Sequence, residues 1–542
     1  MSVEADGQIV VADGLEETAS RIPIPRLLDL RAAEEGNRIA YRWDDCDVTF
    51  ADFRRAARAV GARLRELGLG KCDRVALYLE NSPEWMFAWM GSMYIGVEPV
   101  AINLAYKKEF LQHQVVDSDT RIVFTSPALL GEVVRVVRSC PKVLAVAVVG
   151  DPDDPAVDTT GVRILRFDEF SVGDLVEEDS GVELADGAMI LYTSGTTGMS
   201  KGVALSHGYL ARVAENQEDF LGITESDVVH VPLPLFHISG INGLLHPLRS
   251  RAVSSFQRRF SVAGCLQRMA DVGATVVPMV GPMLQMFWNT PPSPVEKELK
   301  WRLIWCAPIP ISYQDLNRRF GIQEVVTAYG QTEVMPASVG VIPGVPEGSA
   351  GLPMPNLEVK IVGEDGVPVP QGEPGELLLR PTAEFAVFER YLNQPVDRPG
   401  GWYRTGDICR QDQQGHLYWV DRAGDIVRRR GENIPSVLVE QGLLDHPAVR
   451  EVAVHGVPSD LGESEVKAVV VIAPGGSVTE AELFEHCEQV LPGFAVPRYL
   501  EFLDSLPKNP IGRTQKFKLR ERGVTPATAD RLASVEKGGV TR

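Results

Sequence analysis

The sequence is poor in positive charge relative to negative charge, and this shortage excludes several kinds of partner. Its 54 lysines and arginines are outnumbered by 73 acidic residues, which gives a formal net charge of −19 and a pI near 5.1. Such an acidic chain is poorly suited to general binding of nucleic acids or anionic membranes. We therefore expect no nucleic-acid and no membrane partner, and the alternatives of a monomer and a homodimer both stay open.

Cysteines and uninterrupted apolar runs are also scarce. The seven cysteines include no CxxC pair and no metal-ligand spacing, and their odd number is typical of a reducing cytoplasm rather than a disulfide framework. The most apolar long window, 86–105, is interrupted by Glu98, Pro99 and glycines, so it predicts a buried helix followed by a strand. The first residues lack the basic and apolar regions of a signal peptide. These features predict a cytoplasmic location.

The patterns that are present predict an α/β fold in several parts. Apolar strands alternate with helices from residue 74 to 149 and again up to 327, as in parallel sheets covered on both faces. From about Gly348 the chain changes to short strands with Gly and Pro turns, and from about Asp421 it returns to mixed α and β. We predict a large N-terminal domain of parallel α/β sheets with a small β subdomain, and a small mobile α+β C-terminal domain. The expected bounds are an arm at 1–22, a core at 23–420 with the β-rich subdomain at 348–420, a C-terminal domain at 421–522, and a disordered tail at 523–542.

A glycine- and hydroxyl-rich turn lies between two apolar runs, 188–191 and 203–205, and ends at Lys201. Glycines let backbone N–H groups approach an anion, hydroxyls add donors, and a lysine adds a charge. The spacing is not that of a P-loop, because Gly198 and Lys201 are not adjacent. Taken alone, the stretch fits a polar surface loop as well as a phosphate-binding turn. Its residues are Thr193, Ser194, Gly195, Thr196, Thr197, Gly198 and Lys201.

Later stretches carry polar residues that a hydrophobic core would not need. They are Pro232–His237, Ala328–Glu333, Gly401–Asp407, Asp421–Asn433 and Pro507–Arg513. In this order and spacing, over roughly residues 25–520, the set resembles the adenylate-forming superfamily of acyl- and aryl-CoA synthetases, luciferases and peptide-synthetase adenylation domains. The segments 428–433 and 456–466 are most similar to carnitine/crotonobetaine-type CoA ligases.

The resemblance implies an enzyme that uses ATP and Mg²⁺, with CoA as the expected co-substrate. The turn from Thr193 to Lys201 would hold the β- and γ-phosphates, and Thr332 would donate to the α-phosphate. Glu333 would hold Mg²⁺, which prefers oxygen ligands. Arg513 and His237 complete the expected catalytic set of Lys201, Thr332, Glu333, Arg513 and His237.

The same resemblance implies positions for the nucleoside and the acid. Tyr329, beside Gly330, would present a flat face to adenine, Asp407 would accept the ribose hydroxyls, and Arg422 would bind ribose or phosphate. His237 would gate or line the acid pocket together with Cys306, Ala307 and Gln331. Outside this ordered set, each residue has a simpler explanation: a solvated Glu333, a turn residue at Asp407, a packed core histidine at His237 and a solvated basic face at Arg428–Arg430.

Three positions depart from the family pattern. Arg513 stands where the family has a lysine, and its planar fork is not equivalent to a point charge. Gly424 stands at the interdomain hinge, which is usually Asp or Lys, and should let the domains swivel freely. Cys306 precedes Ala-Pro where glycine is common and would narrow the acid pocket.

Three hypotheses follow. The first is a ligase that activates a small or aromatic carboxylic acid as acyl-AMP and transfers it to CoA. The second is a diazotase of secondary metabolism, which would adenylate nitrite for diazotisation of an aryl amine, because Arg513 and a narrowed pocket suit a small oxyanion. The third is an impaired nucleotide-binding scaffold, supported by Arg513 alone.

Overall fold

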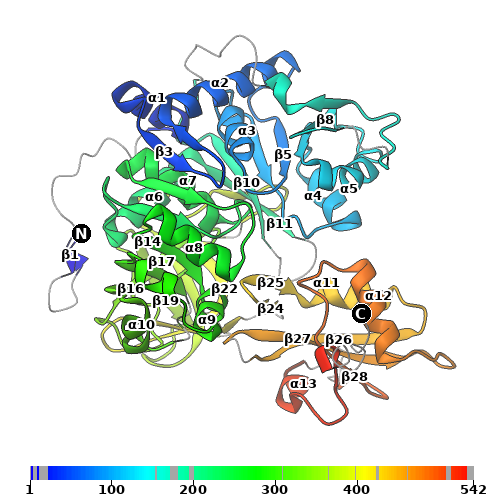
Figure 1. The fold of residues 1–542 in the computed structure, drawn as a ribbon. Coiled ribbons are helices and arrows are strands. Elements are labelled where there is room, and N and C mark those ends of the chain that lie inside the picture. Colours follow the sequence, from blue (N-terminus) through cyan, green and yellow to red (C-terminus); the bar gives the residue numbers. More distant parts are fainter. Residues whose placement is uncertain are drawn as a thin grey trace.

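Two large sheets lie side by side in the N-terminal part of the molecule, with a small sheet and a separate C-terminal unit attached (Figure 1). The computed structural model describes residues 2–3, 9–10, 22–152, 156–170, 181–193, 200–307, 309, 311–363, 365–396, 398–422, 426–459, 462–507, 514 and 516–533. Within the predicted arm, β1 (Ser2–Val3) and β2 (Ile9–Val10) pair with each other.

The first sheet has the strand order β21-β11-β10-β6-β5-β7-β8-β9. Strands β5 to β8 are buried along their whole length except for Arg74, because helices cover the sheet, and this explains their nearly continuous apolar sequences. The strands are β5 (Arg74–Tyr78), β6 (Glu98–Ala101), β7 (Ile122–Thr125), β8 (Ala145–Val148), β9 (Ile164–Arg166), β10 (Gly187–Thr193), β11 (Lys201–Ser206) and β21 (Arg390–Tyr391). The helices between them are α3 (Pro83–Met93), α4 (Lys108–Asp117), α5 (Pro127–Val137) and the 3-10 helix η2 (Phe167–Phe170).

The second sheet has the order β18-β17-β16-β15-β14-β12-β13-β3-β4, with a parallel centre from β16 to β3. Its strands are β3 (Ile39–Arg42), β4 (Asp47–Thr49), β12 (Val228–Val231), β13 (Val253–Phe256), β14 (Val276–Val280), β15 (Leu303–Ala307), β16 (Glu324–Gln331), β17 (Val334–Ile342) and β18 (Leu352–Pro353). Its helices are α1 (Ile24–Glu35), α2 (Phe50–Glu66), α6 (His207–Leu221), α7 (Ile238–Ser250), α8 (Val262–Val272), α9 (Gly281–Asn289), α10 (Tyr313–Phe320) and the 3-10 helix η3 (Pro294–Glu298).

Local sequence signals set the ends of these helices. The Ser206 side chain accepts a hydrogen bond from the Tyr209 backbone N–H at 3.0 Å and so caps α6, which ends at Gly222 in the left-handed conformation. Helix α6 therefore starts directly after β11, which begins with Lys201. One cluster of buried apolar residues runs through both large sheets. The polar residues at the edges of these two sheets are therefore attached to one rigid core.

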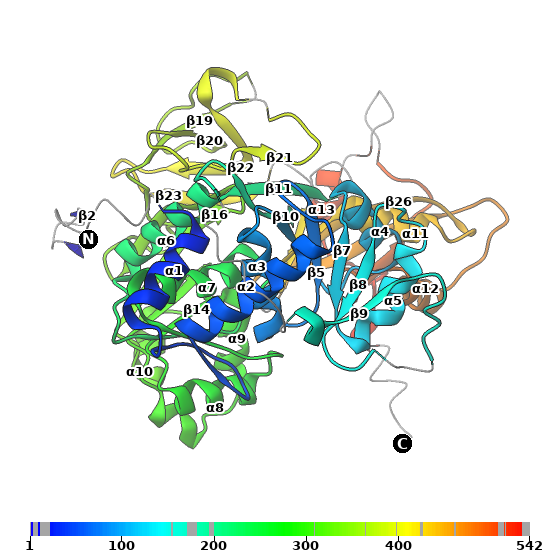
Figure 2. The ribbon, with the colours of Figure 1, turned by 90° about the horizontal axis from the view of Figure 1, so that it is seen from above.

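The small sheet is antiparallel, in the order β19-β20-β22-β23. Figure 2 shows it at the opposite side of the molecule from helices α8 and α10. Its strands are β19 (Leu357–Val362), β20 (Gly375–Pro381), β22 (Tyr403–Gln411) and β23 (Leu417–Arg422), with the 3-10 helix η4 (Pro399–Gly401) before β22.

The C-terminal unit has its own apolar core and sheet. A hairpin of β24 (Ile426–Arg429) and β25 (Glu432–Pro435) precedes a sheet of order β26-β27-β28-β29. The remaining elements are β26 (Val449–Pro458), β27 (Ser464–Ile472), β28 (Tyr499–Phe502), β29 (Ala529–Asp530), α11 (Ser436–Leu444), α12 (Glu480–Val490) and α13 (Lys516–Arg522). The predicted fold class, parallel α/β sheets with a small β-rich sheet and a small α+β C-terminal unit, is confirmed.

Two expectations about single segments have clear outcomes. The window 86–105 forms the buried helix α3 and strand β6, as predicted, and no helix among the described ranges is long and apolar enough to span a bilayer. The expectation of disorder after Gly523 is wrong for residues 525–530. There β29 pairs with β28, and Asp530 forms an ion pair with Arg498 at 3.1 Å, because these polar residues find partners in the C-terminal sheet.

Candidate active site

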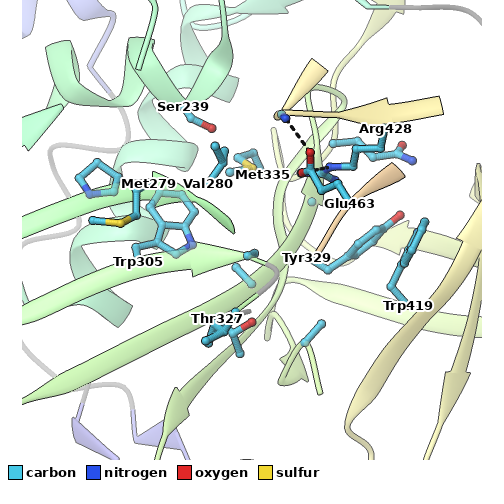
Figure 3. Close-up of a pocket in the computed structure, with 18 of the residues that line it drawn as sticks. Ser239, Met279, Val280, Trp305, Thr327, Tyr329, Met335, Trp419, Arg428 and Glu463 are labelled. Atoms are coloured by element: carbon cyan, nitrogen blue, oxygen red, sulfur yellow. Dashed lines mark hydrogen bonds and ion pairs between the residues drawn. The ribbon is translucent and has the colours of Figure 1, made fainter. Parts of the chain in front are cut away.

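A cavity of about 1210 Å³ opens where the second sheet, the small sheet and the C-terminal hairpin meet. Its walls collect residues from distant parts of the chain, from Thr193 to Ser464. Figure 3 shows part of this cavity, with Tyr329 and Trp419 near each other and Arg428 and Glu463 above them. Ten residues predicted from the sequence line it: Thr193, Lys201, His237, Ala307, Tyr329, Gly330, Gln331, Thr332, Glu333 and Asp407.

One side of the cavity contains Lys201, held close to Glu333 by a tyrosine. Thr193 and Lys201 are partners in the antiparallel register of β10 and β11. The Lys201 ammonium lies 5.3 Å from the centre of the Tyr391 ring, within cation–π range, and the Tyr391 hydroxyl donates to Glu333 Oε1 at 3.0 Å. Glu333 is only 7 % exposed. A cation and a carboxylate are thus fixed beside each other through Tyr391, which the sequence analysis did not single out.

Thr332 and Glu333 occupy the turn between β16 and β17. The Thr332 carbonyl accepts a hydrogen bond from the Tyr209 hydroxyl at 2.8 Å, and the Glu333 carbonyl accepts one from the Phe388 N–H at 2.8 Å. Gly330 lets Met335 pack close to the backbone of this turn, because a Cβ at position 330 would lie only 2.8 Å from Met335 Sδ. The turn is therefore anchored from two other elements, and its side chains have little freedom to move.

A second part of the cavity wall is organised around Asp407 on β22. Its Oδ2 accepts hydrogen bonds from the Tyr329 hydroxyl at 2.7 Å and from Gln331 Nε2 at 2.6 Å. The Tyr403 hydroxyl in turn donates to Gln331 Oε1 at 2.9 Å. Burial raises the pKa of Tyr329 and Tyr403 far above the usual value, so both hydroxyls stay protonated as donors. Gln331, predicted for the acid pocket, belongs to this network as well as to the cavity wall.

Two further residues frame the Asp407 side. Trp419 on β23 is 46 % exposed and lines the cavity near Tyr329 (Figure 3). Arg422, at the end of β23, is the register partner of Asp407. The backbones of Arg422 and Asp407 are therefore adjacent in the small sheet, and the role of Arg422 stays a prediction.

A bound metal ion would need ligands from the carboxylates that line the cavity. Among the residues described, no group of three or more His, Cys, Asp or Glu side chains could hold a metal by itself. Glu333 offers a single carboxylate beside Lys201. This arrangement suits Mg²⁺, which is commonly held by one or two carboxylates while substrate phosphates and water complete its octahedron.

The C-terminal unit contributes a wall of the cavity through the β24–β25 hairpin and the turn before β27. We call this set, Arg428, Arg430, Gly431, Glu432 and Glu463, the C-terminal wall. Glu463 accepts hydrogen bonds from Arg428 Nε at 3.3 Å and from the Gly431 N–H at 2.9 Å, and so holds the tip of the hairpin. Glu432 reaches the core: its Oε1 lies 3.4 Å from His237 Nε2, and its Oε2 accepts from Asn103 Nδ2 at 3.4 Å. Arg428 and Arg430, for which a solvated basic face was the simpler explanation from the sequence, thus line the cavity.

The remaining end of the cavity is apolar. We call it the apolar end and define it by Met279, Val280, Met283, Met286, Trp305 and Met335. The prediction that Cys306 shapes this pocket needs correction: Cys306 is fully buried, while its neighbours Trp305 and Ala307 line the cavity. The reason is the alternation of side chains along β15, which turns every second residue to the other face. Burial raises the pKa of the Cys306 thiol, which fits a packed residue.

Several predicted residues lie outside the described residues. They are Ser194, Gly195, Thr196, Thr197 and Gly198 of the glycine-rich turn, the hinge residue Gly424, and Arg513. Their roles remain predictions.

Comparison with protein families decides the class of the protein. The family model of the AMP-binding enzyme matches residues 28–392, and the model of the AMP-binding enzyme C-terminal domain matches residues 438–513. The chain belongs to the AMP-binding enzyme family. It is an adenylate-forming enzyme of the acyl-CoA synthetase type, as the resemblance implied.

Curated relatives of this AMP-binding enzyme are CoA ligases over nearly their whole length. The crotonobetaine/carnitine–CoA ligase of Salmonella heidelberg is 28 % identical over 520 residues, covering 91 % of this chain and 98 % of the relative. The 2-succinylbenzoate–CoA ligase of Bacillus velezensis is 30 % identical over 503 residues, covering 92 % and 98 %. These relatives agree with the ligase hypothesis, and the comparisons give no support to a diazotase.

Solved structures extend the likeness to three dimensions. A double mutant of o-succinylbenzoate CoA synthetase from Bacillus subtilis, bound with its product analogue OSB-NCoA, has a TM-score of 0.79 and 27 % identity, covering 93 % of this chain and 99 % of that one. The same synthetase in complex with AMP has a TM-score of 0.65 and 27 % identity, covering 92 % and 98 %. The fold of the AMP-binding enzyme is therefore shared along the whole of these synthetases.

Proposed function

We propose that this enzyme joins a carboxylic acid to CoA in two steps at the cavity described above, with ATP as the activating substrate and Mg²⁺ as the metal ion. One observation carries the proposal: Lys201, Glu333 and Asp407, from three separate parts of the chain, line the same cavity as the C-terminal hairpin. This arrangement supplies a cation, a candidate metal ligand and a carboxylate hydrogen-bond acceptor around a single space.

In the first step, a carboxylate oxygen of the acid bonds to the α-phosphorus of ATP, and the bond from that phosphorus to the β-phosphate oxygen breaks. Pyrophosphate leaves and acyl-AMP remains. Two anions must approach each other, so cationic and hydrogen-bonding groups are needed to offset their repulsion. Lys201 and the turn Thr193–Gly198 would hold the leaving phosphates, and Thr332 would donate to the α-phosphate.

Asp407 and Tyr329 would hold the nucleoside. The Asp407 carboxylate would accept the ribose hydroxyls, as carboxylates commonly do in nucleotide sites. Tyr329 is kept in one orientation by its hydrogen bond to Asp407, so its ring offers a fixed face to adenine. Bound Mg²⁺ would neutralise phosphate charge, and Glu333 would be its protein ligand.

In the second step, the CoA sulfur bonds to the acyl carbon, the bond from that carbon to the AMP oxygen breaks, and the thiol proton passes to solvent. The C-terminal wall supports this step because the hairpin tip at Gly431 lies against the apolar end. A Cβ added to Gly431 would lie only 3.4 Å from a methyl carbon of Val280. The higher TM-score to the product-analogue complex, 0.79 against 0.65 for the AMP complex of the same synthetase, supports an arrangement of domains suited to the CoA step.

The proposal is tested by incubating the enzyme with ATP, Mg²⁺ and panels of aliphatic and aromatic acids. Pyrophosphate release with CoA omitted, and trapping of acyl-AMP by hydroxylamine, report the first step; the CoA thioester, measured by mass spectrometry, reports the second. We expect an acid-dependent release of pyrophosphate and a CoA-dependent thioester. Nitrite with an aminoaryl acid serves as the control arm, and AMP release that needs nitrite and ignores CoA would contradict the ligase.

A further inference from the structure

The apolar end of the cavity has a distinct chemistry from the rest of its wall. Its members, Met279, Val280, Met283, Met286, Trp305 and Met335, are thioether, aliphatic and indole side chains. Ser239, at the start of α7, adds a neutral hydroxyl (Figure 3). Lys201, Glu333, Asp407 and the charged members of the C-terminal wall belong to other parts of the cavity wall. A bound acid would therefore place its carboxylate toward Lys201 and its body in uncharged surroundings.

Trp305 gives this end a rigid aromatic wall. It lies in β15 between β14 and β16, in register with Pro278 and Val326, and is only 6 % exposed. The Phe220 ring packs edge-to-face against it, with centroids 5.7 Å apart and an interplanar angle of 79°. Because strand pairing fixes the backbone and Phe220 fixes the ring, the indole cannot turn aside for a bulkier or branched body.

Thioethers surround this indole. Met279, Val280, Trp305 and Met335 gather on one side of Tyr329 in Figure 3, and Met283 and Met286 follow on α9. Sulfur and indole surfaces are polarisable and make favourable contacts with the edge and face of an aromatic ring. Such a lining favours a flat aromatic body.

The six side chains that define the apolar end include no charged group that could pair with a second charge on the acid. On the adjoining C-terminal wall, Arg428 Nε already lies 3.3 Å from Glu463 Oε1, and Glu432 Oε1 already lies 3.4 Å from His237 Nε2. A charge that leaves water without a compensating partner costs free energy, and the cost grows with burial.

We propose that the substrate is an aromatic monocarboxylic acid whose body carries no further charge, with its ring against Trp305. This inference rests on the proposed function, because it names the acid that the ligase would activate. It separates this enzyme from ligases that act on acids with a second ionic group.

The test uses matched acids that differ only in one substituent. Benzoic, phenylacetic and cinnamic acids are each compared as the para-methyl, para-carboxylate and para-trimethylammonium derivatives, with octanoic acid as the aliphatic control. We expect kcat/KM for pyrophosphate release to be at least about tenfold higher for the methyl member of the best set than for its two charged partners. Equal or higher values for a charged partner, or for octanoic acid, overturn the inference while leaving the ligase function intact. No release with any acid of the panel contradicts the proposed function itself.

Substitutions at two positions locate the preference in the cavity. Trp305→Ala should raise KM for the aromatic acid about tenfold and leave KM for ATP within about twofold, whereas Trp305→Phe should keep most of the affinity. Ser239→Lys, at a partly exposed position, should narrow or reverse the discrimination between the methyl and carboxylate members. Thermal melting checks the fold of each variant. If both Trp305 variants and Ser239→Lys retain the wild-type preference, the ring does not lie at this end and the inference is wrong.

Discussion

The N-terminal and C-terminal parts of the cavity wall are built in different ways. We call the N-terminal part the core wall; it consists of Lys201, Tyr329, Thr332, Glu333, Tyr391 and Asp407. On the core wall, buried groups hold each other at short range: Tyr329 to Asp407 at 2.7 Å and Tyr391 to Glu333 at 3.0 Å. The C-terminal wall reaches the core through longer polar contacts, from Glu432 Oε1 to His237 Nε2 and from Asn103 Nδ2 to Glu432 Oε2, both at 3.4 Å.

This difference has a functional meaning. A wall fixed by buried hydrogen bonds keeps its geometry when its neighbour changes, whereas a wall held by a few half-exposed contacts can separate at little cost. We expect the core wall to set the chemistry of adenylation and the C-terminal hairpin to set the chemistry of the thiol step. Substitutions on the two walls should therefore affect different products.

The largest effect is expected from Lys201→Ala on the core wall. The variant removes the cation beside the proposed phosphates, and loss of one well-placed electrostatic group typically lowers a rate by about 10²–10³-fold. Pyrophosphate release with saturating acid and ATP is the measurement. Lys142→Ala is the matched control, because Lys142 is an exposed lysine paired with Asp119 away from the cavity. A loss below threefold for Lys201→Ala would show that this lysine does not hold the phosphates.

A smaller and more selective effect is expected from Gly431→Ala on the C-terminal wall. Gly431 has φ +80° and faces Val280, so an alanine is strained at the hairpin tip. We expect thioester formation to fall about tenfold while hydroxamate formation from acyl-AMP stays within about twofold.

Gly475→Ala is its matched control, with φ +78° in the same C-terminal unit and open space around the added Cβ. It should slow neither step by more than about twofold. If Gly431→Ala slows both steps equally, the hairpin does not act separately on the thiol step, and the comparison of the two walls fails.

Tyr391 allows a finer test of the core wall, because its ring and its hydroxyl have separate contacts. Tyr391→Phe removes the hydrogen bond to Glu333 and keeps the ring beneath Lys201, so the Mg²⁺ concentration for half-maximal rate should rise about fivefold. Tyr391→Leu also removes the ring and should raise KM for ATP a further two- to fivefold. Tyr418→Phe, which removes a similar hydroxyl contact to Asp412 at 3.1 Å, is the control. An unchanged Mg²⁺ requirement in Tyr391→Phe would leave Glu333 without support as the metal ligand.

The smallest effect near neutral pH concerns the stability of the C-terminal unit. Burial desolvates the Glu501 carboxylate, but hydrogen bonds from Lys467 and Arg522 outweigh this and lower its pKa to about 2. A lowered pKa in the folded state stabilises the fold fully above the ordinary carboxyl pKa, so this stability should be lost as pH falls from about 4.5 toward 2. Urea titrations followed by hydrogen-exchange mass spectrometry of β27 peptides measure it. Glu501→Gln should be less stable at pH 6 and lose little more on acidification; an equal acid loss in this variant would place the effect elsewhere.

Much of the core wall could be predicted from the sequence, because polar residues in otherwise apolar surroundings mark it. Thr332, Glu333 and Asp407 follow or interrupt apolar strands, and the structure brings them to one cavity. Tyr391, Tyr403 and Trp419 were missed because aromatic residues are ordinary in strands, and only the pairing of distant strands shows which of them face a cavity. Cys306 was predicted to face the cavity, but its neighbours Trp305 and Ala307 do so instead. The local sequence does not determine which face of a strand points to the cavity until the pairing of the sheet is known.

The C-terminal region shows the same limit from the other direction. A short polar segment after Gly523 has no apolar pattern of its own, yet Asp530 and Thr525 find partners in Arg498 and Glu501. Polar composition alone does not distinguish a free tail from a strand whose partners come from elsewhere in the chain.

The contact of Glu432 with His237 also bears on the lifetime of the reaction intermediate. An acyl adenylate is a mixed anhydride that water can hydrolyse, and a hairpin held over the cavity by this contact would shield it from bulk water. The fraction of adenylate that becomes thioester rather than free acid should therefore depend on the contact between Glu432 and His237. In wild-type enzyme the ATP consumed should match the thioester formed. Weakening the contact of Glu432 with His237 should lower the yield of thioester per ATP before it slows the overall turnover of ATP.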